Sequence, residues 1–255
     1  MKLPKECSVF LPIKRGMQGR SVRLIQEWLS LHDHGTTIDG DYGPATEAVV
    51  RRFQTFSQIH PTGLVDEATM KALLLPMMSA TKQLATTAET LSQRVLAAAR
   101  QHLKQYPRGL GGAHDGPWIR LYTGGAEGPD VHWNAAFVSY LLDQATEGLP
   151  ADVRPLDKHD TVTAMAADAI RRGIFVPGKV ALEDKTIMAE LRPGNIFLRR
   201  HPDRDDAWIH CGIVTAFLAD YIETIEVAVD EAGRLPGNEV ARRFRGYRHL
   251  DFVKV

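Results

Sequence analysis

HWNAAFVSYL, residues 132–141, is the stretch around which the second half of the chain is organised. Phe137, Leu141 and Ala145 recur at four-residue intervals, which predicts an amphipathic helix with one apolar face. We expect this helix to begin at Asn134, after a glycine-rich approach over residues 124–129. Unpaired backbone N–H groups and the positive end of the helix dipole lower the pKa of a thiol at such a position. The start of the helix is therefore a place for a nucleophile, although Asn134 carries a carboxamide.

The same stretch resembles the W-C-A-x-F-V signature of the CHAP and NlpC/P60-like cysteine amidases and endopeptidases. Trp133, Ala135, Phe137 and Val138 carry the likeness. The resemblance implies a papain-like domain that acts on peptidoglycan, with Trp133 beside the substrate. It also implies that Asn134 stands where the family has its nucleophilic cysteine.

A histidine and an acid for the same site lie in the last third of the chain. Residues 210–214, HCGIV, resemble the H-V-G-I-V strand that supplies the family's catalytic base, which makes His210 the candidate. Glu226 follows sixteen residues later, where a hairpin returns the chain beside His210, and matches the family's orienting acid. A lone histidine on a strand is more often structural, but the Gly-Ile-Val tail and the spacing to Glu226 favour the family role.

Other residues are poorer candidates for a nucleophile. Cys211 neighbours His210 on one strand, so its side chain should point to the opposite face. Ser139 lies well round the helix from Asn134, and Asn134 itself is suited to be an N-cap. A zinc site has no supporting H-x-x-x-H or H-x-H spacing, and we expect no metal or other cofactor. The residues weighed for zinc were His114, Asp115, Asp130, His132 and His210.

Residues 15–75 predict a separate unit of three short amphipathic helices joined by two turns rich in Gly and Asp. The unit resembles the peptidoglycan-binding type 1 domain, which implies that it binds the bacterial cell wall. Asp41 and Tyr42, in the first turn, are the expected wall contacts. The likeness is carried by Gly16, Gly19, Val22, Ile25, Gln26, Asp39, Gly40, Tyr42, Gly43, Thr46, Val50, Phe53, Gln54, Thr62, Gly63, Val65, Asp66 and Thr69.

The predicted architecture is α+β. Residues 1–14 form an N-terminal extension, and residues 76–90 form a linker within a long helix that runs to about residue 106. Residues 91–255 form the papain-like domain, with a loop over 109–130 and helices packed on a small antiparallel sheet. Its strands are expected at 209–218 and 221–229, which form a hairpin, and at 196–198, 240–247 and 250–253.

Amino-acid composition indicates which classes of partner the protein is expected to bind and in which compartment it is expected to be made. The chain has 255 residues, with 31 Lys+Arg against 31 Asp+Glu, a balance that favours neither nucleic acid nor an anionic membrane. The two cysteines, Cys7 and Cys211, are too few for a disulfide framework. No signal peptide is recognised, so we expect synthesis in the cytoplasm and action at the cell wall or in the periplasm after lysis or another export route. The oligomeric state is left open.

Two functions therefore remain. The first is a peptidoglycan-targeting protein whose cysteine-hydrolase-like domain has lost catalysis. The second is a peptidoglycan amidase or endopeptidase of the active type, a lysin or secreted cell-wall effector, captured with its nucleophile substituted. Three departures from the family pattern, Asn134, Asn195 (Asp in the family) and Ala228 (Asn in the family), favour the first.

Overall fold

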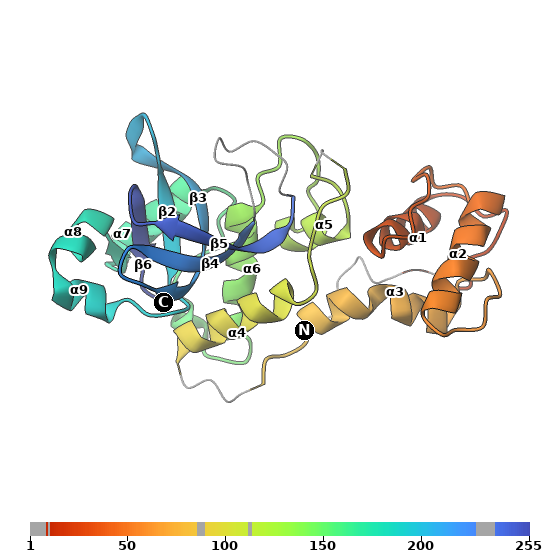
Figure 1. Ribbon diagram of the computed structural model, residues 1–255, viewed down its shortest axis with the longest axis horizontal. Coiled ribbons are helices and arrows are strands. Elements are labelled where there is room, and N and C mark those ends of the chain that lie inside the picture. The colour runs from red at the N-terminus through yellow and green to blue at the C-terminus, as the bar shows by residue number, and fades with distance from the viewer. Residues whose placement is uncertain (1–8, 10, 86–89, 112–113, 228–237) are drawn as a thin grey trace.

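The computed structural model describes residues 9, 11–85, 90–111, 114–227 and 238–255. A small helical unit contains α1 to α3, and a larger α+β unit contains the remaining helices and the sheet (Figure 1). Helix α3 extends from the first unit toward the second, and α5 faces α1 across the boundary. Within the described part of the chain, no helix is both long enough and apolar enough to cross a membrane.

The first unit is built from α1 (Arg20–Leu31), α2 (Pro44–Phe56) and α3 (Glu67–Ala80), as the apolar periodicity predicts. Asp66 caps α3, because its side chain accepts a hydrogen bond from the Thr69 N–H at 2.8 Å. The apolar faces of the three helices form one buried core. Its members include Val22, Ile25, Trp28, Leu29, Val50, Phe53, Met70 and Leu73.

Two buried glutamines hold the turns between these helices. The Gln26 amide donates to Asp39 Oδ1 at 2.8 Å, and its oxygen accepts from the Gly40 N–H at 2.8 Å. Gln54 repeats the arrangement at the second turn, where it donates to the Thr69 hydroxyl at 2.9 Å and accepts from the Gly63 N–H at 2.9 Å. Each side chain satisfies polar groups that its turn buries, so the glutamines of the motif are structural.

The predicted long helix over the linker is wrong. Helix α3 continues through Pro76 to Ala80, residues 81–85 are not helical, and α4 (Leu91–Leu103) begins afresh. Thr90 starts α4 with a capping box, since its hydroxyl and the Gln93 side chain each bond the other residue's backbone N–H. The capping box starts a new helix at this point, although the residues on both sides have a composition that favours helix. The remainder of the expected linker, residues 86–89, lies outside the described residues.

Helices of the second unit surround α6 (Asn134–Thr146), whose apolar residues are buried. Helix α5 (Pro117–Thr123) lies within residues 109–130, which were predicted to be a loop, so that prediction is wrong for this segment. It begins at Pro117, a residue suited to a first helical turn, and buries Trp118, Ile119 and Tyr122. The other helical segments are η2 (Ala151–Val153), α7 (Val162–Arg171), α8 (Gly178–Glu183) and α9 (Lys185–Glu190).

In the described part of the chain, the sheet has six strands in the order β1-β6-β2-β3-β4-β5, and each neighbouring pair is antiparallel. The predicted hairpin is present as β3 (Arg204–Phe217) and β4 (Tyr221–Val227), and the register pairs Gly212 with Glu226. The α+β class and the antiparallel sheet are therefore confirmed. The other strands are β1 (Phe175–Val176), β2 (Ile196–His201), β5 (Val240–Gly246) and β6 (Leu250–Val253).

Polar and aromatic contacts join the two units. Arg120 of α5 pairs with Glu27 of α1 at 2.6 Å, and both side chains are largely buried. The rings of Trp28 and Trp118 meet edge to face, with centroids 6.2 Å apart. Arg108 adds a hydrogen bond to the Leu31 carbonyl at 2.9 Å. The boundary is thus packed and hydrogen-bonded rather than an open gap.

We predict that Gln26→Met destabilises the protein, because the substitution keeps the length of the side chain but leaves buried polar groups of the first turn unpaired. The expected loss in the free energy of unfolding is about 2–4 kcal/mol. Urea unfolding followed by circular dichroism measures it. Gln83→Met, at an exposed position outside any helix, is the matched control and should change little. Equal unfolding midpoints for the two variants would contradict the structural role of Gln26.

Candidate functional site

Asn134 is the first residue of α6 rather than its N-cap, a position that Trp133 occupies. The Asn134 side-chain oxygen accepts a hydrogen bond from the adjacent Ala135 N–H at 2.7 Å, so it does not bond the N–H groups that an N-cap satisfies. The expected N-cap role is therefore wrong. The backbone N–H groups of the first turn and the helix dipole still favour negative charge at this point.

The Asn134 amide nitrogen faces the sheet. It lies 3.2 Å from His210 Nδ1 and 3.3 Å from the Ile209 carbonyl oxygen. An amide NH₂ can only donate, so His210 Nδ1 is the acceptor and the ring proton is on Nε2. His210 thus presents an unprotonated nitrogen to the first residue of α6.

The other ring nitrogen of His210 faces a buried carboxylate. His210 Nε2 is 3.5 Å from Glu226 Oε2, which is within ion-pair distance but long for a hydrogen bond. Arg245 binds both oxygens of Glu226, at 2.8 and 2.6 Å, and the Thr224 hydroxyl donates to the carboxylate at 3.2 Å. The structure therefore brings Asn134, His210 and Glu226 together in one row.

The pKa values follow from burial and pairing. Burial is the largest effect on His210 and lowers its pKa, although Glu226 opposes the shift. Burial alone would raise the pKa of Glu226, but its contacts with His210 and Arg245 outweigh that effect and hold the pKa below the usual value. The site accordingly contains a neutral imidazole beside an ionised carboxylate.

Gly212 makes the contact between His210 and Glu226 possible. It lies opposite Glu226 in the hairpin, and a Cβ atom added there would come within 2.7 Å of the Glu226 Cβ and 2.8 Å of the Phe197 ring. Only glycine leaves room for the Glu226 side chain to lie across β3 toward His210. The glycine of the HCGIV segment is thus a steric requirement of the site.

Arg245 was missed by sequence reasoning. It lies on β5 and shares a face with Glu226 through the β4–β5 register, in which it is opposite Ile222. The strand contains other arginines, Arg242 and Arg243, at neighbouring positions. Only the strand register distinguishes the arginine that reaches the carboxylate.

Chemically, the arrangement places an imidazole next to Asn134 and a carboxylate on the far side of that imidazole. An unprotonated imidazole nitrogen next to the first residue of a helix could accept a proton from a thiol there, with Glu226 stabilising the resulting imidazolium. The carboxamide of Asn134 cannot take the nucleophile's role. Cys211 cannot replace it, because its side chain is fully buried and burial raises its pKa well above the usual value.

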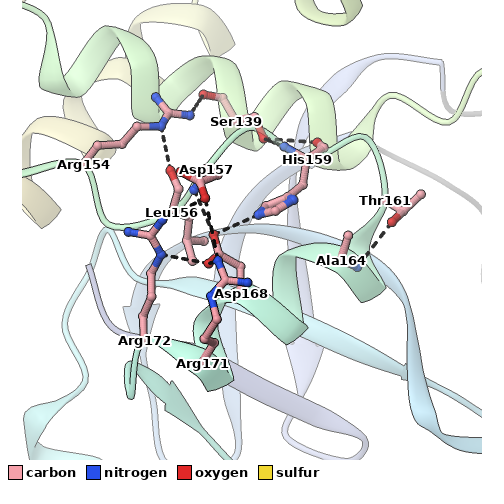
Figure 2. Close-up of polar contacts among 10 residues, drawn as sticks. All are labelled: Ser139, Arg154, Leu156, Asp157, His159, Thr161, Ala164, Asp168, Arg171 and Arg172. Carbon is pink, nitrogen blue, oxygen red and sulfur yellow. Dashed lines mark hydrogen bonds and ion pairs between the residues drawn. The ribbon is translucent and has the colours of Figure 1, made fainter. Parts of the chain in front are cut away.

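Ser139 belongs to a second polar cluster, which contains the residue types of a serine hydrolase without their geometry (Figure 2). Its hydroxyl donates to the His159 carbonyl at 3.2 Å and accepts from the His159 N–H at 3.1 Å, so it bonds backbone rather than the ring. The His159 ring instead contacts Asp168 at 2.9 Å, and Arg172 also pairs with that carboxylate at 2.8 Å. The cluster fastens the chain before α7 to α6 and thereby supports the helix that holds Asn134.

Two residues that we expected to contact the wall or a substrate, Tyr42 and Trp133, are buried in the structure. The Tyr42 side chain is fully buried, and its hydroxyl donates to the Gly63 carbonyl at 2.9 Å. Trp133 is 2% exposed and stacks on Tyr122 with an interplanar angle of 3°. Neither ring is available to a ligand at the surface. Asp41 is exposed, as expected of a contact residue, and its role stays a prediction.

The residues considered as zinc ligands do not lie together at one place in the described structure. Among the described residues, no group of three or more His, Cys, Asp or Glu side chains is placed to hold a metal ion. The His114 and His132 rings have centroids 6.4 Å apart, whereas His210 faces Asn134 and Glu226. Among the described residues, the side chains weighed for zinc thus do not form one cluster.

Besides Asn134, the sequence departs from the family pattern at two other residues, Asn195 and Ala228. The Asn195 side-chain oxygen accepts from the Arg192 N–H at 2.8 Å, which closes the turn before β2. A carboxylate oxygen could make the same bond, so Asn195 says nothing about lost chemistry. Ala228 lies outside the described residues. Asn134 is thus the departure that bears on catalysis.

Comparison with known proteins identifies the first unit. Residues 18–73 match the family described as a peptidoglycan binding domain. A CHAP or NlpC/P60 domain was not detected, and no curated protein matches the sequence. A peptidoglycan-binding domain is therefore found at residues 18–73, and the second unit is interpreted from its geometry.

Proposed function

We propose that this protein binds peptidoglycan through its first unit and carries a papain-like, cysteine-hydrolase-like domain that does not catalyse hydrolysis. The peptidoglycan-binding domain at residues 18–73 suggests targeting to the polymer and action at the cell wall. The second unit supports the rest of the proposal through its helix start, its strand-borne histidine and its buried acid. Peptidoglycan stem peptides are the substrate class that this resemblance implies for the second unit.

One observation carries the non-catalytic assignment. The Asn134 amide donates to His210 Nδ1 at 3.2 Å, so the nitrogen that would accept a nucleophile's proton is already bonded to a group that cannot attack. Removing the nucleophile of a hydrolase of this kind costs on the order of a million-fold in rate. Binding without turnover is the function that remains.

The alternative is an amidase or endopeptidase of the active type whose nucleophile has been substituted. The retained contacts favour it, because His210, Glu226 and Arg245 keep the arrangement that a thiol at position 134 would need. The start of α6 would also stabilise a thiolate. The two functions therefore differ only in what happens when sulfur replaces the carboxamide.

We predict that the full-length protein sediments with purified peptidoglycan sacculi. The expected result is depletion of the protein from the supernatant in proportion to added sacculi, with cellulose particles of similar size as the control. Gel densitometry of the supernatant and pellet measures it. Equal recovery in the supernatant with and without sacculi would show that the domain at residues 18–73 does not target the protein to the wall.

We also predict that the protein as it stands releases no muropeptides from sacculi, because position 134 lacks a nucleophile. Chromatography of the soluble products measures release, and His210→Gln supplies the background. Robust digestion that disappears with His210→Gln would refute the proposal and require a different nucleophile.

Asn134→Cys tests whether the site still activates a thiol. We expect iodoacetamide to alkylate the new thiol about tenfold faster near pH 6 than it does in the same protein carrying His210→Gln as well, because His210 favours the thiolate. A Cys7→Ser background removes the thiol outside the described residues, and Cys211 is buried. Equal alkylation rates would show that His210 does not act on position 134. Rapid release of muropeptides by Asn134→Cys would favour the alternative function.

A further inference from the structure

A pocket of about 450 Å³ lies on the boundary between the two units. The first unit contributes the end of α1, Phe56 at the end of α2 and Pro76 of α3, and the second contributes residues 105–108 after α4 and Trp118 of α5. The volume falls in the range of small-ligand sites. The pocket is complete only when both units are in place, and neither the helix start at Asn134 nor His210 belongs to it.

Two aromatic side chains line the pocket from opposite units while remaining largely exposed. Phe56 and Tyr106 are each 74% exposed. Phe56 is supported from behind by the His34 ring, with centroids 5.4 Å apart. Large exposed rings that line a concavity mark an interaction site more often than isolated surface rings do.

The lining also contains polar side chains, and their charges sum to zero. Asp33 and Arg108, one from each unit, pair at 2.5 Å and neutralise each other. His32 bonds the Leu73 carbonyl at 2.8 Å, and burial lowers the pKa of its ring, which is therefore neutral near pH 7. Gln105 adds an amide that can both donate and accept hydrogen bonds.

Trp28 adds a further polar group to the lining. Its indole N–H is buried and has no hydrogen-bond acceptor among the described residues. Buried polar groups are nearly always paired, so an unpaired donor at a pocket requires an explanation. Because Trp28 is fully buried, this N–H is closed to a ligand in the pocket, and no ligand contact is assigned to it.

A second cavity, of about 290 Å³ between α1 and α5, has a different character. Four of the charged groups that line it pair with one another, since Arg120 binds Glu27 at 2.6 Å and Glu127 at 2.6 Å, and Arg23 binds Glu27 at 3.0 Å. These charges are explained by the contact between the units. In the 450 Å³ pocket, Phe56 and Tyr106 stay largely exposed, so burial at the contact between the units does not account for their position.

We propose that the 450 Å³ pocket binds an N-acetylated hexosamine of the peptidoglycan glycan strand, with Phe56 and Tyr106 packing against the sugar. The identity of the polymer rests on the proposed function. A sugar offers apolar C–H faces to aromatic rings and uncharged hydroxyl and acetamido groups to Gln105, His32 and the paired Asp33 and Arg108. Stem peptides carry free carboxylates, for which a lining without net charge supplies no counter-charge.

The soluble N-acetylglucosamine tetramer chitotetraose is the probe, titrated into the full-length protein by calorimetry. We expect binding that Phe56→Ala and Tyr106→Ala each weaken by about three- to tenfold, because each removes one aromatic contact. Tyr106→Phe keeps the ring and should bind nearly as well as the parent. Phe244→Ala is the matched control, because Phe244 is 70% exposed on β5, away from the pocket, and should not change binding.

Circular dichroism and thermal unfolding confirm that the variants fold, which their exposed positions favour. Sedimentation with sacculi then separates this proposal from the proposed function. Chitotetraose binding that is absent, or unaffected by Phe56→Ala and Tyr106→Ala, overturns the saccharide pocket even where the parent sediments with sacculi. A free stem tripeptide that binds in a manner sensitive to these two substitutions, where chitotetraose does not, also overturns it. Pocket-dependent chitotetraose binding without sedimentation supports the pocket and refutes wall targeting, and failure of both refutes both.

Discussion

The buried ion pair between Glu27 and Arg120 sets how the two units meet. Glu27 is almost completely buried on α1, and a buried carboxylate without a partner would cost several kcal/mol. Arg23 of its own helix pairs with one carboxylate oxygen, and Arg120 of α5 supplies a second, largely buried partner when α5 lies against α1. The edge-to-face contact of Trp28 with Trp118 follows from this placement. The same placement brings the exposed rings of the two units around one pocket.

A second buried carboxylate organises the sheet in the same way. Glu226 on β4 is satisfied by Arg245 from β5 and approached by His210 from β3, so one charge fixes side chains of three adjacent strands. Gly212 is the steric condition for that arrangement, because any side chain there would collide with Glu226 and Phe197. The histidine and the acid are thus held by packing as well as by electrostatics, whether or not chemistry follows.

The sequence predicted the amphipathic helices and the hairpin, because these depend on the spacing of apolar residues along the chain. It did not predict which side chains are buried by contacts with residues distant in the chain. The β3–β4 hairpin and the amphipathic helices follow from residue spacing. Tyr42 reads as an exposed turn residue, but its hydroxyl bonds Gly63, which lies 21 residues away in the chain. Trp133 likewise follows a polar loop, yet Tyr122 stacks on it from a helix within a glycine-rich stretch. Arg245 required the strand register, which the sequence does not specify.

Retention of the histidine and acid does not by itself argue for activity. His210 is 2% exposed, and a small apolar residue at position 134 would leave its Nδ1 atom without the hydrogen bond that Asn134 donates. Asparagine supplies a donor from the place where the resemblance puts a thiol, so the Nδ1 atom of the buried imidazole stays hydrogen-bonded although position 134 carries no nucleophile. Glu226 and Arg245 are retained for the same reason, since deleting either would strand the charge of the other. Under the proposed function, a domain without catalysis would therefore still have a physical reason to keep the rest of the site.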